Sequence, residues 1–63
     1  MYNNLREARK KSGITAKEIC KRLELKTEQG YFKKETGAIS TTVEEALILS
    51  KLFGVAVEIL FFK

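Results

Sequence analysis

Two threonine–glutamate pairs with the same spacing divide this chain into short segments and so limit what it can fold into. Thr15 stands three residues before Glu18, and Thr42 stands three residues before Glu45. In such a capping box the threonine hydroxyl accepts a hydrogen bond from a backbone N–H of the first helical turn, and the glutamate carboxylate accepts one from the threonine N–H. The sequence therefore predicts that a helix begins directly after each of these threonines.

Glycines indicate where helices end. Gly13, Gly37 and Gly54 each follow a stretch that fits a helix, and glycine readily adopts the left-handed backbone found just after a helix. The start and stop signals together divide the chain into five predicted segments. These are Asn3 to Ser12, Ala16 to Glu24 or Leu25, Thr27 to about Glu35, Val43 to Phe53, and Val55 to Phe62.

Two of these segments leave alternatives open. Gly30 lies inside the third segment, where glycine costs roughly 1 kcal/mol relative to alanine, so a ragged or short helix is an alternative to a continuous one. In the last segment, Val-Ala-Val and Phe-Phe favour a strand, whereas Glu58-Ile59-Leu60 fits a helix. We favour the helix there.

Length and composition favour one compact helical domain. The chain has 63 residues, of which 44% are hydrophobic and 32% charged, and it has no proline. A chain this short buries barely enough apolar surface to offset its conformational entropy, so economical helix packing is the expected solution. We therefore predict a single domain over residues 1–63, of the all-α class, built as a compact bundle of four to five short helices.

Charge is unevenly distributed along the chain. The formal net charge is +4; residues 1–34 carry ten Lys and Arg against four Glu, whereas residues 35–63 carry two Lys against four Glu. A basic half favours a polyanionic partner such as nucleic acid, although many solvated helices are also rich in lysine. Charge alone leaves both interpretations open.

Residue types that other functions need are missing or rare. The sequence has no histidine, no aspartate and no glycine-rich phosphate loop, so we predict no enzyme, metal site, cofactor or small-molecule ligand. The single cysteine, Cys20, cannot form an intramolecular disulfide and is expected in the core, which favours a reducing, cytoplasmic setting. The longest apolar run, Ile59 to Phe62, is too short to cross a membrane, and the first residues show no signal-peptide-like run.

The second and third predicted helices lie only a residue or two apart, as in a helix-turn-helix. Several segments carry a family resemblance: Leu5-Arg6-Glu7-Ala8-Arg9, Gly13-Ile14-Thr15, Tyr31 to Gly37, Glu45-Ala46 and Leu52-Phe53-Gly54-Val55. In these residues the chain resembles, over essentially its whole length, the Cro and phage-repressor regulators, the XRE-type helix-turn-helix family. The resemblance implies a five-helix, lambda-repressor-like domain that usually binds operator DNA as a dimer, with the third helix as recognition helix.

The resemblance also indicates which residues contact DNA. Residues at the start of a recognition helix reach the base edges, and Gln29 is the best candidate because an amide can pair with adenine through two hydrogen bonds. Lys33 and Lys34 are expected to bind phosphate, and Lys17 follows Ala16, which stands where the family often has a glutamine that contacts the DNA backbone. The predicted set is Lys17, Thr27, Glu28, Gln29, Phe32, Lys33 and Lys34.

Structural alternatives stand beside these assignments. The lysines and Gln29 could simply be solvated, and Tyr31 is expected to pack in the core rather than stack on a base. Glu35 resembles the family's structural acidic residue. The interval from Cys20 to Glu35 is about one residue longer than is common in the family, which affects the turn between the two helices.

The apolar C-terminus predicts a partner surface. Ile59, Leu60, Phe61 and Phe62 exceed what so small a core needs, and a surplus of large apolar groups often marks an interface. We predict a homodimer; the alternative is that these residues close the bundle of a monomer.

The predicted function is that of a sequence-specific regulator of transcription that binds double-stranded DNA, a repressor of phage or mobile-element type. The alternative is a protein-interaction module, of antirepressor or antitoxin-like character, that uses the apolar C-terminus and binds no DNA.

Overall fold

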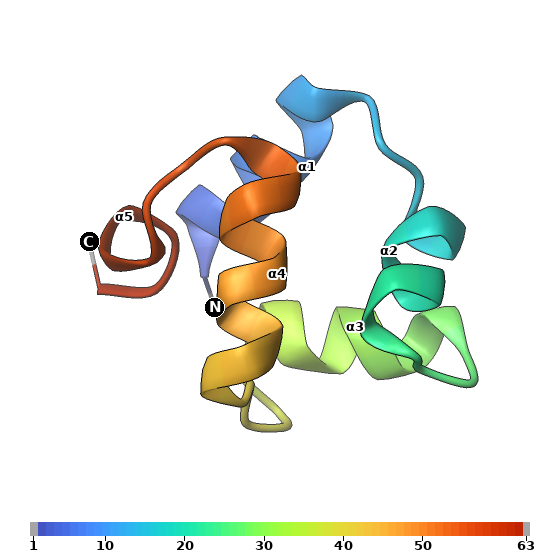
Figure 1. Ribbon diagram of the computed structural model, residues 1–63. Helices are drawn as coiled ribbons and strands as arrows, with labels where there is room; N and C mark the ends of the chain where they lie inside the picture. Colours follow the sequence, from blue (N-terminus) through green and yellow to red (C-terminus); the bar gives the residue numbers. More distant parts are fainter. Residues whose placement is uncertain (1, 63) are drawn as a thin grey trace.

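In the computed structural model, which describes residues 2–62, the chain forms five α-helices and no strand (Figure 1). The helices are α1 Asn3–Ser12, α2 Ala16–Leu23, α3 Glu28–Thr36, α4 Val43–Phe53 and α5 Val57–Phe62. The predicted all-α bundle is therefore confirmed, and the last segment forms the favoured helix rather than a strand, although the helix begins at Val57 and not at Val55. Residues 1 and 63, the outer ends of the predicted domain, lie outside the described residues.

Local hydrogen bonds fix where the helices begin. The Thr15 hydroxyl accepts from the Glu18 N–H at 3.2 Å, and the Thr42 hydroxyl accepts from the Glu45 N–H at 3.1 Å. At Thr42 the capping box is complete, because Glu45 Oε1 accepts the Thr42 N–H at 3.0 Å. Both predicted starts are confirmed. So are the predicted stops, with left-handed backbone at Gly13, Gly37 and Gly54.

Helix α3 is continuous through Gly30. This glycine lies in the first turn, and its N–H donates to the Thr27 hydroxyl at 3.3 Å. The N-cap thus satisfies the backbone at the position that glycine weakens. The alternative of a ragged third helix is wrong.

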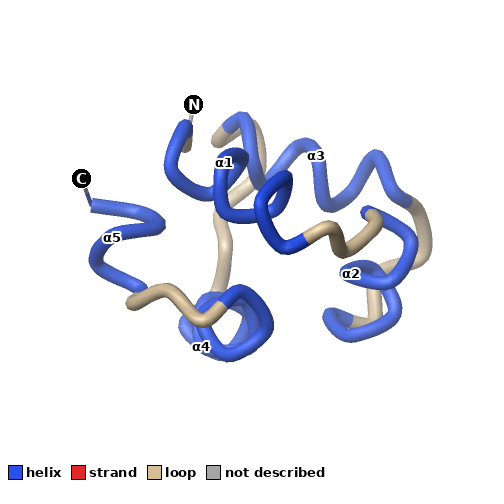
Figure 2. The backbone as a smooth tube through the Cα atoms, turned by 90° about the horizontal axis from the view of Figure 1, so that it is seen from above, coloured by secondary structure: helices blue, strands red, loops and turns tan. Residues whose placement is uncertain are grey.

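The helices pack so that two separate surfaces remain. Helix α1 packs against α3, α4 and α5, while α2 packs against α3 and α4. Figures 1 and 2 place α5 on one side of the molecule and the α2–α3 pair on the other. Within residues 2–62, α5 packs only on α1 and α4. A partner bound at α5 would therefore leave α2 and α3 open.

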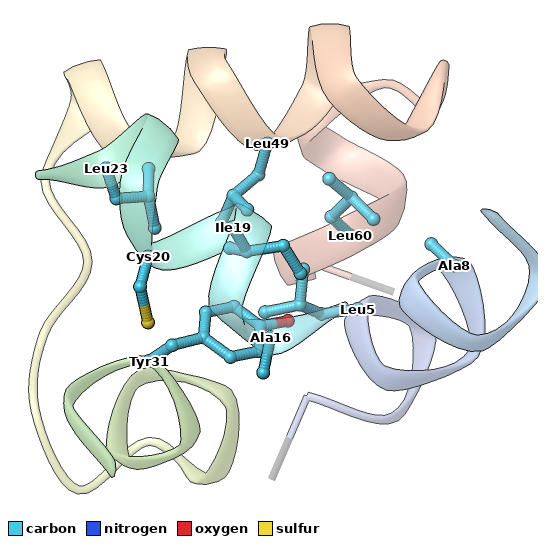
Figure 3. Packing of buried hydrophobic residues seen from close by; sticks show 9 residues of the cluster. All are labelled: Leu5, Ala8, Ala16, Ile19, Cys20, Leu23, Tyr31, Leu49 and Leu60. Atoms are coloured by element: carbon cyan, nitrogen blue, oxygen red, sulfur yellow. The ribbon is translucent and has the colours of Figure 1, made fainter. Parts of the chain in front are cut away.

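A single core joins the helices, and each helix contributes one large, fully buried side chain to it (Figure 3). These side chains are Leu5, Ile19, Tyr31, Leu49 and Leu60. Fully burying a residue such as leucine or isoleucine contributes about 1.5–3 kcal/mol. With one such residue per helix, the core depends on all five helices at once.

The core settles the position of two residues that the sequence left open. Tyr31 has no exposed surface, which confirms its structural role. Leu60, predicted at a dimer interface, is 1% exposed and belongs to the core cluster. That prediction is wrong for Leu60, because the packing of α5 on α1 and α4 covers this side chain.

Candidate nucleic-acid interface

The connection between α2 and α3 comprises residues 24–27. Helix α2 ends at Leu23, one to two residues before the predicted end, because Glu24 adopts a left-handed backbone with a φ of 58°. The Leu25 N–H then donates to the Cys20 carbonyl at 2.9 Å, and the Leu25 side chain packs against the core. The connection is longer than the residue or two expected, and it accommodates this length by turning Leu25 inward.

Cys20 ties α2 to the start of α3. Its thiol is buried and donates to the Thr27 carbonyl at 3.2 Å, and in Figure 3 the sulfur points toward α3. Burial, with a smaller contribution from the negative charge of Glu28, raises the pKa of the Cys20 thiol. A raised pKa lowers the thiolate fraction and hence reactivity. The expected core role of Cys20 is confirmed.

Two shallow hollows mark the outer surface of the α2–α3 pair. One lies on α3 alone and is lined by Gln29, Phe32, Lys33 and Thr36. The other spans α2, the turn and the first residues of α3. Its lining residues are Lys17, Cys20, Lys21, Leu25, Lys26, Thr27 and Glu28. Six of the seven predicted DNA-contacting residues therefore come together on this surface, and all six are exposed.

Lys34 is the exception. It is 7% exposed, and its ammonium donates to the Ser40 carbonyl at 3.0 Å and to Glu45 Oε1 at 2.9 Å. Lys34 follows Tyr31 by three residues and so shares the inner face of α3. The prediction that Lys34 binds phosphate does not fit this position, because its charge is already paired between α3 and α4.

The carboxylate of Glu45 is held in its charged form by these contacts. Burial acts to raise its pKa, but the hydrogen bond from the Thr42 N–H and the nearby Lys34 outweigh burial and lower it. One carboxylate oxygen thus joins α3 to the N-cap of α4.

A second ion pair holds α3 to α1. Arg9 Nε donates to Glu35 Oε2 at 2.9 Å, and Arg9 Nη2 donates to Glu35 Oε1 at 3.3 Å. This hydrogen bonding to Glu35 raises the pKa of Arg9 further, and burial raises the pKa of the neighbouring Tyr31 hydroxyl far above its usual range. Glu35 is 3% exposed, in keeping with the structural role that the resemblance implied.

Three exposed residues of this surface, Thr36, Lys21 and Lys26, lie outside the predicted set, although the two lysines are of the type expected to bind phosphate. Thr36 lies four residues after Phe32, a helical spacing that would have found it. Lys21 and Lys26 flank the turn, and Lys21 lies four residues after Lys17 on α2. They add positive charge beside the N-terminal end of α3.

A comparison with protein families identifies this arrangement. A family model described as helix-turn-helix matches residues 5–60, which includes all of α2 and α3. This chain belongs to the helix-turn-helix family. The resemblance to the XRE-type regulators is thereby confirmed, and with it a DNA-binding, transcription-regulating role. Members of this family are typically not enzymes. No curated protein and no solved structure matches the chain.

The helices of this helix-turn-helix protein are short. Among residues 2–62, no helix has both the length and the apolar character that crossing a membrane would require.

Proposed function

We propose that this helix-turn-helix protein represses transcription by binding a specific double-stranded DNA sequence, with α3 in the major groove. The observation that carries the proposal is the contrast between the two sides of α3. The inner side is locked by Tyr31, Lys34 and Glu35, whereas the outer side presents Gln29 and Lys33 to solvent. A rigid helix with exposed polar side chains is what base recognition requires. The proposal includes no catalytic step.

The exposed residues divide into two roles. Gln29 is in the first turn of α3 and pairs with adenine, while the adjacent Glu28 accepts a hydrogen bond from cytosine N4. Lys17 and Lys33 neutralise phosphates and fix the register of the protein on the duplex. Thr27 lies at the N-cap and contacts the DNA backbone.

We further propose that two copies of the chain bind together through the α4–α5 surface. A groove between these helices is lined largely by apolar side chains, and Val43, Leu47 and Phe62 at this groove are 76%, 50% and 77% exposed. Phe61 forms one wall of the groove and packs against Tyr2 with ring centroids 5.1 Å apart. Exposed apolar surface of this kind favours association.

A second copy is the occupant that fits the DNA-binding role. Because α5 does not pack on α2 or α3, and the described residues that line the groove include none from α2 or α3, contact there leaves both recognition helices open. A two-fold pair presents two α3 helices about 34 Å apart to a palindromic site. Of the four residues predicted at this interface, Ile59 and Phe62 are exposed and Phe61 lines the groove, so these three remain in the proposal.

Selection from a randomised pool of double-stranded DNA, at two salt concentrations, tests the proposal. We expect enrichment of a short palindrome, with an affinity that falls steeply as salt rises because bound counterions are released. Binding without enrichment would indicate a non-specific role. No binding at either salt concentration would overturn the proposal in favour of the protein-interaction module.

Two single variants then separate the roles on the selected operator. Gln29→Ala should relax discrimination at one base pair by about 1–3 kcal/mol. Lys33→Ala should weaken binding to all sequences alike. It should also lower the slope of log affinity against log salt concentration by about one, as expected for the loss of one phosphate contact. Equal losses of discrimination in both variants would contradict this division.

A further inference from the structure

Phe32 is the one large apolar side chain on the outer face of α3 within the described residues. It is 39% exposed, and its neighbours around the hollow are the polar residues Gln29, Lys33 and Thr36. Leaving aromatic surface in water is unfavourable. The other side chains of this face can form hydrogen bonds, whereas Phe32 needs an apolar group of the ligand to cover its ring.

The Phe32 ring is held from behind by contacts within the protein. The Arg9 guanidinium carbon lies 5.3 Å from the ring centroid, and the Tyr31 ring packs edge-on at 5.6 Å. Arg9 is itself fixed by two hydrogen bonds to the buried Glu35. The ring thus has little freedom, and ordering it on binding costs little entropy.

The chemistry of the major groove offers such a ring one apolar feature. The base edges there present hydrogen-bond donors and acceptors, and their one apolar group is the C5 methyl of thymine, which phenylalanine can contact. 5-Methylcytosine carries the same group. Phe32 follows Gln29 by three residues, which places both side chains on adjacent turns of one helix.

We infer that Phe32 contacts the C5 methyl group of a pyrimidine, normally thymine, next to the base pair that Gln29 contacts. This inference rests on the proposed DNA-binding function and adds a specificity-determining residue to it. Phe32 contributes no hydrogen bond; it distinguishes a methylated from an unmethylated pyrimidine at one position of each half-site. The pairing of Arg9 with Glu35 serves this contact by positioning the ring.

Replacing each thymine of the selected operator by deoxyuridine, one position at a time, tests the inference. This change removes a methyl group and leaves base pairing intact. We expect one position per half-site at which the wild-type protein binds about four-fold more weakly, the effect of removing roughly one methyl from an apolar contact. At that position, a 5-methylcytosine–guanine pair should bind more tightly than a cytosine–guanine pair by a similar factor.

Variants assign the effect to the ring. Phe32→Ala should bind the thymine and deoxyuridine operators equally, whereas Phe32→Leu, which keeps an apolar side chain, should retain part of the difference. Ile48→Ala is the matched control, because Ile48 is 37% exposed but lies on α4, outside both α3 hollows. This control should keep the full difference. Circular dichroism establishes that each variant is folded.

The outcomes separate this inference from the proposed function. Operator binding that is insensitive to every thymine replacement would overturn the methyl contact and leave the DNA-binding function intact. The same would follow if folded Phe32→Ala kept the full thymine preference. A wild-type protein that selects no operator would overturn both.

Discussion

The α2–α3 surface and the α4–α5 surface of this protein differ in what they leave exposed, although one core supports both. The α2–α3 surface presents lysines and polar groups, with Phe32 as its exposed large apolar residue. The α4–α5 surface presents Val43 and Phe62, each more than three-quarters exposed. A polar, basic surface suits phosphate and base edges, whereas an apolar one suits another protein surface.

The two surfaces also differ in how they are held. Behind α3, the ion pairs Arg9–Glu35 and Lys34–Glu45 anchor the helix to α1 and to α4. Helix α5 is anchored mainly by apolar packing through Leu60. Ion pairs demand a defined geometry, so they hold α3 in one orientation.

The largest expected effect comes from placing a charge on the apolar surface. Leu47→Glu should prevent association, because it would bury a carboxylate opposite apolar groups of the second copy. Losing the second recognition helix should weaken binding to a palindromic operator at least about 100-fold. Sedimentation and operator titration measure the two effects.

Ile48→Glu is the matched control for Leu47→Glu. It introduces the same charge on the next residue, which does not line the groove. Because Leu47 and Ile48 are 50% and 37% exposed, both variants should still fold, which circular dichroism checks. A Leu47→Glu protein that associates as the wild type does would show that this groove is no interface.

The next largest effect concerns the anchor of the polar surface. Arg9→Met should lower the free energy of unfolding by about 3 kcal/mol, because it leaves the buried Glu35 carboxylate without a partner. The double variant Arg9→Met with Glu35→Leu should recover much of this loss, since apolar residues often replace a buried ion pair without cost. Urea unfolding measures both. If the single and double variants were equally unstable, the ion pair would not be the cause.

A smaller effect on stability is expected at Gly30 and Glu24, where another residue type would suit the backbone conformation better. Gly30→Ala should raise the free energy of unfolding by up to about 1 kcal/mol, because alanine favours a helix more than glycine does. The added Cβ fits, since it would lie 3.8 Å from the Thr27 hydroxyl and 3.9 Å from Leu25. Glu24→Gly should raise it by about 1 kcal/mol, since Glu24 has a φ of 58°. Gly13→Ala, at a φ of 72°, should do the opposite. Urea unfolding at neutral pH compares the three.

The smallest effect is the pH dependence of the link between α3 and α4. Because the pKa of Glu45 is lowered in the folded protein, its charged form adds stability above the ordinary glutamate value of 4.5. This stability should be lost as the pH falls from 4.5 through the lower folded value. Below pH 4.5, the midpoint temperature of thermal unfolding should therefore fall less steeply with pH in Glu45→Gln than in the wild type. Identical slopes would argue against the contribution of Glu45.

The sequence by itself determined where most of the helices begin and end, but not that α2 ends at Leu23 or that α5 begins at Val57. The hydrogen bonds of Thr15 and Thr42 join residues three apart, and the left-handed stops at the glycines need no distant partner. Such interactions form from neighbours along the chain, so local pattern predicts them. The same holds for the outer face of α3, because helical spacing fixes that Gln29 and Lys33 lie together.

Only the tertiary structure decided which residues of a helix are covered. Lys34 and Leu60 were both predicted on surfaces, yet one is paired with Glu45 and the other is in the core. Their burial depends on Glu45, eleven residues from Lys34, and on the packing of α5 against α1. The orientation of Phe32 likewise depends on Arg9 of α1. Contacts between residues far apart in the chain have no local signature, because they exist only once the helices have packed.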